Sequence, residues 1–97
     1  MKSVANINDL FILFREKNLF QRYNLHRIGV FGSFARGEQF HDIDLFIEED
    51  IDIDQLLDLK QLLEKETGKQ FDIMQKKYAE PVILYRALKD MKYAAAS

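Results

Sequence analysis

The strongest constraint on the fold of this chain is an alternating segment at residues 42–48, Asp-Ile-Asp-Leu-Phe-Ile-Glu. Successive side chains of a β-strand point to opposite faces, so this alternation predicts a strand with one apolar and one polar face. The apolar face has to be buried, whereas Asp42 and Asp44 would project together from the opposite face. Any fold proposed for the chain must therefore cover one side of this strand and leave two neighbouring carboxylates on the other.

Two further strands and three helices are predicted around this segment. Residues 27–31 and 70–75 are short β-type runs. Apolar residues at helical spacing, with capping residues at the ends, predict helices from Ile7 to near Asn18, from Asp52 to Thr67 with Gly68 closing it, and from Pro81 through Met91. The resulting order, α-β-(turn)-β-α-β-α, predicts an α/β (α+β) fold with helices packed on a small mixed sheet.

The size and composition of the chain narrow the class of protein. A chain of 97 residues has room for one hydrophobic core, and we expect residues 1–97 to form one domain with a frayed end at 94–97. Without cysteine, disulfides and thiolate zinc sites are excluded. The chain has no apolar run of the roughly 20 residues that span a bilayer, and its net charge of -2 comes without a basic stripe. We therefore expect a cytoplasmic protein that binds neither a membrane nor duplex nucleic acid.

A third carboxylate lies in the strand at 70–75, where Asp72 stands between Phe71 and Ile73. Aspartate is depleted from strands, so an aspartate inside an apolar β-type segment suggests a role beyond solvation. Strand pairing could bring Asp72 to Asp42 and Asp44, and the repulsion among them would favour a hard cation such as Mg²⁺. The alternative is that Asp42 only caps a turn and that the other two are solvated on an exposed face.

A glycine-bounded turn, Gly-Ser-Phe-Ala-Arg-Gly at residues 32–37, precedes the carboxylate strand. Glycine lets backbone N–H groups approach phosphate oxygens, and a helical turn that follows would direct its positive end at the same anion. Gly32 and Ser33 are therefore candidate phosphate-binding residues, and Arg36 could neutralise phosphate charge or simply be solvated. The turn is not a Walker A loop, because no Gly-Lys-Ser/Thr follows.

The succession GSFARG, DID, LFIE and FDI, between Ile28 and Ile73, resembles the minimal nucleotidyltransferases of the DNA polymerase β superfamily. The resemblance implies a polymerase β palm-like fold, with the first and last helices in that family's places. It further implies that Asp42, Asp44 and Asp72 are catalytic and bind two Mg²⁺ ions, and that ATP is the substrate. Gly32 and Ser33 would hold the β- and γ-phosphates.

Members of this family commonly act as antitoxins beside a HEPN-domain toxin. By resemblance, the chain would transfer AMP from ATP to a tyrosine of that toxin. The alternative is a non-catalytic antitoxin that neutralises the HEPN partner by contact, because the loop at residues 38–41 is shorter than the family's usual connection. A second departure is His41, which stands where a serine is common in the family and leaves the phosphate geometry open. A sugar-transferring enzyme is disfavoured by the length of the chain. The sequence leaves the base specificity and a homo-oligomer open.

Overall fold

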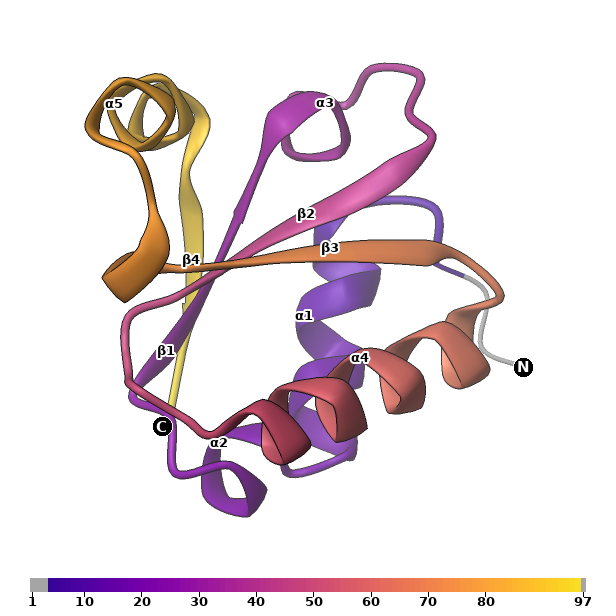
Figure 1. Ribbon diagram of the computed structural model, residues 1–97. Coiled ribbons are helices and arrows are strands. Elements are labelled where there is room, and N and C mark those ends of the chain that lie inside the picture. Colours follow the sequence, from indigo (N-terminus) through magenta and orange to yellow (C-terminus); the bar gives the residue numbers. More distant parts are fainter. Residues whose placement is uncertain (1–3, 97) are drawn as a thin grey trace.

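The structure is a computed structural model that describes residues 4–96. It contains a four-stranded sheet with strand order β3-β2-β1-β4 and a layer of helices against it (Figure 1). No helix of the described part of the chain is both long and apolar enough to cross a membrane. In chain order the elements are α1 (Ile7–Glu16), α2 (Leu19–Arg22), β1 (Arg27–Phe31), α3 (Gly32–Ala35), β2 (Asp42–Ile47), α4 (Ile53–Thr67), β3 (Gln70–Gln75), the 3₁₀ helix η1 (Lys76–Tyr78), α5 (Pro81–Asp90) and β4 (Lys92–Ala95).

The sheet is mixed, as the sequence predicted. β1 pairs antiparallel with both β2 and β4, whereas β2 and β3 are parallel. Parallel neighbours need a crossover connection, and α4 supplies it between β2 and β3. The bounds of α4 follow from its caps, because the Asp52 carboxylate accepts the Gln55 N–H at 2.8 Å and Gly68 adopts left-handed backbone with φ 69°.

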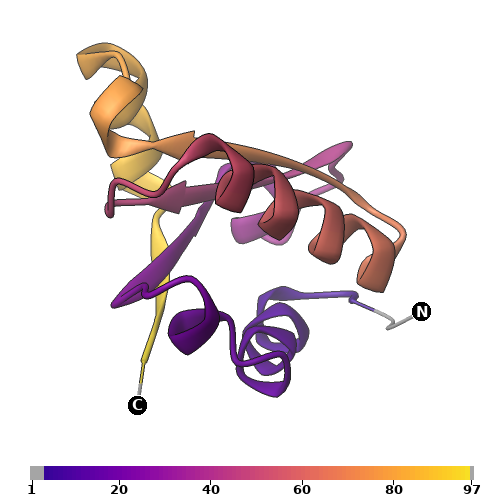
Figure 2. The same ribbon diagram turned by 60° about the horizontal axis from the view of Figure 1, so that its bottom comes forward.

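One face of the sheet is buried under α1, α2 and α4, which Figures 1 and 2 show on the same side of the strands. Ile43, Leu45 and Ile47 form the predicted apolar face of β2 and are fully buried. Each such side chain stabilises the fold by roughly 1.5–3 kcal/mol through removal of apolar surface from water. Their fully buried neighbours in the helices and in β1 are Leu10, Leu13, Phe14, Leu19, Ile28, Val30, Leu59 and Leu63.

The C-terminal end departs from the prediction of a frayed segment at 94–97. Ala94 and Ala95 belong to β4, where Ala94 pairs with Ile28 and is buried. The N–H of Ala96 also donates to the His26 carbonyl at 2.9 Å. This pairing satisfies backbone groups along the edge of β1 that would otherwise be unpaired. Ser97 lies outside the described residues.

The last helix is shorter than predicted, and Met91 follows it in extended conformation. The Met91 sulfur and the Tyr93 ring lie over the middle of β1, where Gly29 leaves room for them. A Cβ on Gly29 would lie 2.5 Å from Met91 Sδ and 3.2 Å from Tyr93 Cε1. Met91 thus leaves the helical path and lies against the second face of the sheet at Gly29.

A short helix, α2, joins the helical layer to β1 and was not predicted, because four residues are too few to display helical periodicity. Tyr23 follows α2 and donates its phenolic O–H to Asp58 Oδ2 of α4 at 2.5 Å. Burial of the phenol, together with this hydrogen bond, raises the pKa of Tyr23 to about 12. The bond ties the connection before β1 to the crossover helix.

Candidate active site

Three aspartates lie on the face of the sheet that turns away from the helical core. In the parallel pairing of β2 and β3, Asp44 is opposite Asp72, and Ile43 is opposite Phe71. Ile43 and Phe71 are buried in the core, so the alternation of the strands places Asp72 on the same face as Asp44 and Asp42. Asp44 is half-buried, while Asp42 and Asp72 are exposed. Two segments distant in sequence thus bring the predicted carboxylates to one place.

The electrostatics of this cluster are those of crowded carboxylates. Burial, reinforced by the charges of Asp72 and then Asp42, raises the pKa of Asp44 to about 6, whereas the charge of Arg36 opposes the change. At neutral pH the Asp44 carboxylate is therefore largely ionised, at a cost in free energy. A nearby cation would offset that cost.

The glycine-bounded turn lies directly against these carboxylates. Gly32 opens α3 with φ +76°, a left-handed conformation that other residues rarely adopt, and a Cβ on it would overlap the Asp44 carboxylate. Ser33 follows in the first turn and is partly exposed. The sequence predicted a helical turn at this point, and α3 is that turn. The absence of a side chain at residue 32 lets the backbone of the turn and the β2 carboxylates lie side by side.

Arg36, the third candidate for phosphate contact, is held by two carboxylates. Its Nε donates to Glu38 Oε1 at 3.0 Å, and its Nη1 donates to Asp90 Oδ2 at the end of α5 at 2.6 Å. Guanidinium carries five N–H donors, so Nη2 still offers two to an incoming anion. Arg36 makes no ion pair with Asp44, yet its charge is close enough to lower the pKa of that group.

A hollow of about 390 Å³ opens beside the carboxylates, on the side of β3 and α4. Glu64 of α4 accepts the Phe71 N–H at 2.9 Å and so satisfies a donor on the outer edge of β3. Sequence reasoning did not identify Lys60, because an exposed lysine on a helix carries no signal until the fold places it beside the aspartates. The lining residues are Asp42, Lys60, Glu64, Gln70, Phe71 and Asp72.

The chemistry of the donor set can be tested against Mg²⁺. Among residues 4–96, no group of three or more His, Cys, Asp or Glu side chains is arranged to hold a metal ion by itself. Mg²⁺ in nucleotide sites commonly takes only one or two carboxylates and completes its shell with water and substrate phosphates. Asp44 with Asp42 or Asp72 meets that requirement, and the raised pKa of Asp44 marks the place where a cation is favoured. The residues present therefore fit Mg²⁺ bound together with a triphosphate.

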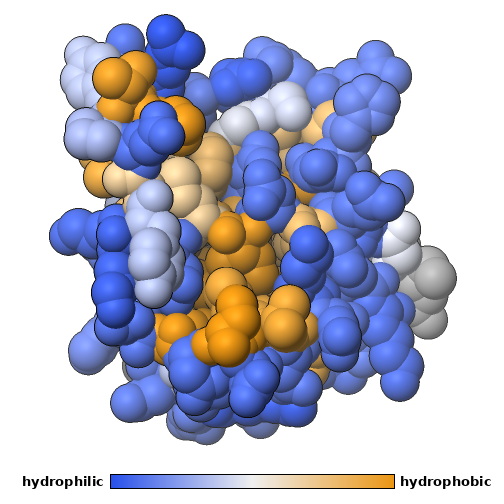
Figure 3. All heavy atoms as spheres, viewed as in Figure 1, coloured by the Kyte–Doolittle hydropathy of each residue, from blue (hydrophilic) through white to orange (hydrophobic). Residues whose placement is uncertain are grey.

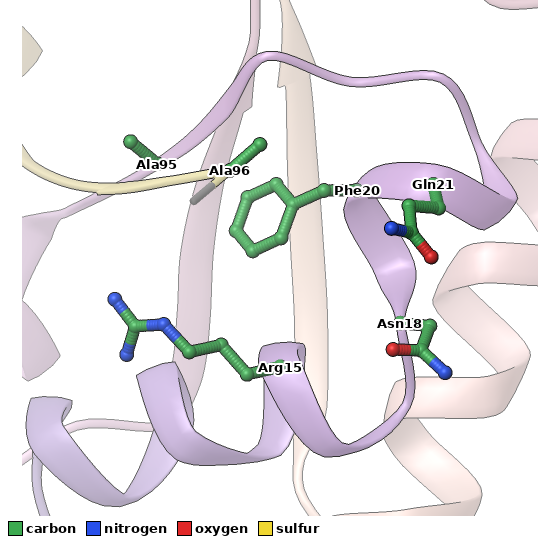
Figure 4. Close-up of a pocket in the computed structure, with 6 residues that line it drawn as sticks. All are labelled: Arg15, Asn18, Phe20, Gln21, Ala95 and Ala96. Atoms are coloured by element: carbon green, nitrogen blue, oxygen red, sulfur yellow. The ribbon is translucent and has the colours of Figure 1, made fainter.

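A second hollow lies at the other end of β1, between the C-terminal end of α1, α2 and β4. Figure 4 shows the Phe20 ring and the Arg15 side chain facing this space. Its volume is about 120 Å³, well below the 300 Å³ or more that ligand pockets usually enclose. It carries none of the predicted site residues, so the carboxylate face remains the candidate active site.

Comparison with known proteins identifies the family and the fold of the chain. Residues 15–93 match the family described as "Polymerase beta, Nucleotidyltransferase". No curated protein matches the chain. A crystal structure of a mutant of the toxin-antitoxin MntA-HpeT superposes with a TM-score of 0.72 at 23% identity, over 97% of this chain and 75% of that chain.

Two other solved structures share the fold at similar identity. A toxin-antitoxin crystallised with AMP-PNP gives a TM-score of 0.71 at 22% identity, over 94% of this chain and 75% of that chain. A structure named as a minimal nucleotidyltransferase gives 0.60 at 24% identity, over 84% of this chain and 93% of that chain. These likenesses establish the fold, and the family match covers most of the sequence. The chain therefore belongs to the polymerase beta nucleotidyltransferase family.

Proposed function

We propose that the chain is the antitoxin of a toxin–antitoxin pair and a Mg²⁺-dependent enzyme that transfers AMP from ATP to a tyrosine of a HEPN-domain toxin in the cytoplasm. In this reaction the phenolic oxygen bonds to the α-phosphorus of ATP, the bond from that phosphorus to the bridging oxygen breaks, and pyrophosphate leaves. The proposal is supported by membership of the nucleotidyltransferase family and by the likeness to toxin-antitoxin structures, one of them with AMP-PNP.

The observation that carries the proposal is the pairing of Asp44 with Asp72 directly beside Gly32. Asp42, Asp44 and Asp72 would hold two Mg²⁺ ions, which when bound offset the charge of the triphosphate and of the leaving pyrophosphate. We assign Asp72 the role of general base, which accepts the proton of the attacking hydroxyl. Asp72 is exposed beside the hollow between β3 and α4, where the acceptor can reach it.

The phosphate-binding roles fall to the turn that begins at Gly32. Its backbone N–H groups and the Ser33 hydroxyl are assigned the β- and γ-phosphates, because no side chain at residue 32 stands between the turn and the carboxylates. We assign Arg36 the role of donating a hydrogen bond from Nη2 to a phosphate oxygen. Its hydrogen bonds to Glu38 and Asp90 hold the guanidinium plane in place.

Transfer of a label from the α-phosphorus of ATP to the partner tests the reaction directly. The chain would be incubated with Mg²⁺, ATP labelled at the α-phosphorus and the HEPN-domain protein encoded beside it, and label on the partner would be followed. Wild type and a control variant, Asp54→Ala on the exposed first turn of α4, should both label the partner. The double variant Asp42→Ala/Asp44→Ala should not, and persistent labelling by that variant would refute the proposal.

A second candidate is a non-catalytic antitoxin that neutralises the same toxin by contact. It is favoured by the short loop at residues 38–41, which joins the glycine-bounded turn to the carboxylate strand. Toxin neutralisation in cells separates the two functions. Equal protection by wild type and Asp44→Ala would favour binding alone, whereas loss of protection with retained binding would favour catalysis.

A further inference from the structure

A group of large apolar side chains is exposed on η1 and α5, next to the carboxylate face. Their exposed fractions run from 49% to 72%, although they come from one stretch of eleven residues. Figure 3 shows apolar side chains at the surface at the position of α5. We call this set the α5 apolar surface, and it consists of Tyr78, Val82, Ile83, Tyr85 and Leu88.

Packing within the chain does not account for these residues. Of the α5 side chains, Ala87 is buried and Leu84 is partly buried, so the helix rests on the sheet through a narrow stripe. A surface helix ordinarily turns its apolar residues toward the core and its polar residues outward. Here Val82, Ile83 and Leu88 face water instead, and contiguous apolar surface of this kind marks sites of interaction.

The segment that carries the α5 apolar surface has a net charge opposite in sign to that of the whole chain. Residues 76–93 carry five basic and two acidic residues, a net charge of +3, whereas the full chain has a net charge of -2. A second copy of the chain would bring two basic rims together, which is unfavourable. Nucleic acid would place phosphates against valine, isoleucine and leucine. The basic residues concerned are Lys76, Lys77, Arg86, Lys89 and Lys92, of which Lys77 is paired with Asp50 at 3.1 Å.

The α5 apolar surface is physically joined to the candidate active site. Asp90, the last residue of α5, accepts a hydrogen bond from Arg36 at 2.6 Å, and Arg36 directly follows the phosphate-binding turn α3. A protein bound to the α5 apolar surface would therefore lie beside the carboxylates and could present a side chain to them.

From these observations we infer that the α5 apolar surface is the docking site of the acceptor protein, and that the acceptor meets it with an apolar patch rimmed by acidic residues. The inference rests on the proposed function for the identity of the partner. Apolar contact would supply the affinity, and the opposite charges of the two rims would orient the partner and speed association. Binding here places the acceptor hydroxyl on the open face of the sheet, where Asp44 and Asp72 lie.

The test measures binding of the HEPN-domain toxin encoded beside the chain, by calorimetry in the absence of ATP. The variant Val82→Glu/Tyr85→Glu replaces two exposed apolar residues with glutamates. An acidic rim on the toxin would repel these negative charges. We expect its affinity for the toxin to fall at least about tenfold, a loss of about 1.4 kcal/mol. The matched control, Ile53→Glu/Leu57→Glu, changes two exposed apolar residues of α4 and should bind as wild type does.

Further arms separate this inference from the proposed function. Asp44→Asn should bind the toxin normally and fail only in AMP transfer, so absence of transfer by wild type would count against the proposed function and not against docking. An unchanged affinity of Val82→Glu/Tyr85→Glu, or a wild-type chain that does not bind the toxin, would overturn the inference. So would sedimentation showing that wild type forms a dimer which the same variant converts to a monomer, because the occupant would then be a second copy.

Discussion

Replacing Asp44 by asparagine should stabilise the protein while removing its response to Mg²⁺. The pKa of Asp44 rises from 3.8 to about 6 in the folded chain, chiefly through burial and through the charge of Asp72. Such a rise corresponds to up to about 3 kcal/mol of destabilisation by the ionised group, since a tenfold change in proton affinity is about 1.4 kcal/mol. Asp44 is only half-buried, and screening by solvent reduces this cost to about 1–2 kcal/mol. Asparagine keeps the size of the side chain and carries no charge.

The sign of the pH dependence follows from proton binding. Because the folded state holds the Asp44 proton more tightly than the unfolded state, the contribution of this group to stability falls as pH rises from about 4 to about 6 and then levels off. The free energy of unfolding of Asp44→Asn should therefore exceed that of wild type by about 1–2 kcal/mol at pH 7, and by little at pH 4. In a domain of this size the gain at pH 7 corresponds to a rise in Tm of about 4 °C or more.

Urea unfolding in EDTA at pH 4 and pH 7, followed by circular dichroism, measures both values. Asp54→Asn is the matched control, because Asp54 is exposed in the first turn of α4 and its loss should cost a few tenths of a kcal/mol. Addition of Mg²⁺ with AMP-PNP should then stabilise wild type and not Asp44→Asn. Equal stability of the two proteins at pH 7 would contradict the raised pKa of Asp44, and an equal gain from Mg²⁺ and AMP-PNP would show that the carboxylate cluster is not a cation site.

Three other substitutions test separate parts of the structure. Gly32→Ala should lower the free energy of unfolding by about 1–3 kcal/mol and AMP transfer by at least about tenfold, since its Cβ would displace the Asp44 carboxylate; activity near that of wild type would contradict the assigned turn geometry. Asp90→Ala should raise KM for ATP about two- to fivefold with little change in kcat, because Arg36 loses an orienting bond; an unchanged KM would contradict the assigned role of Arg36 in the phosphate site. Tyr23→Phe should lower the free energy of unfolding in urea by about 1 kcal/mol and remove from a spectrophotometric titration a tyrosine whose pKa is about 12; a titration curve identical to wild type would contradict the buried phenol.

Local patterns were sufficient to predict the elements that carry a strong period or a strong cap. β1 and β3 occupy the predicted residues, and α4 begins after Asp52 and ends before Gly68, because side-chain caps and left-handed glycine act within a few residues. α2 and β4 were missed for the opposite reason. Four-residue elements have no period of their own, and β4 is a strand only because β1 offers it an edge.

Some features of the candidate site could likewise be predicted from local sequence patterns, whereas others depend on tertiary packing. Asp42 and Asp44 could be assigned to one face from alternation alone, because two residues apart in a strand share a face whatever the strand pairs with. That Gly32 lies against Asp44, that Arg36 is tied to Asp90 and that Lys60 borders the hollow beside Asp72 all depend on tertiary packing. No periodicity in the sequence carries those contacts.

The three carboxylates lie together only in the observed register of β3 against β2. Burial of the apolar face of the sheet fixes this register. If β3 slipped by one residue against β2, the alternation of the strand would carry Asp72 into the apolar layer and Phe71 onto the open face. Burial of a carboxylate there costs several kcal/mol, and loss of the buried Phe71 ring costs about 3 kcal/mol or more, so the slipped pairing is strongly disfavoured. The residues that bury the helix-covered face of the sheet therefore also fix the chemistry of the opposite face.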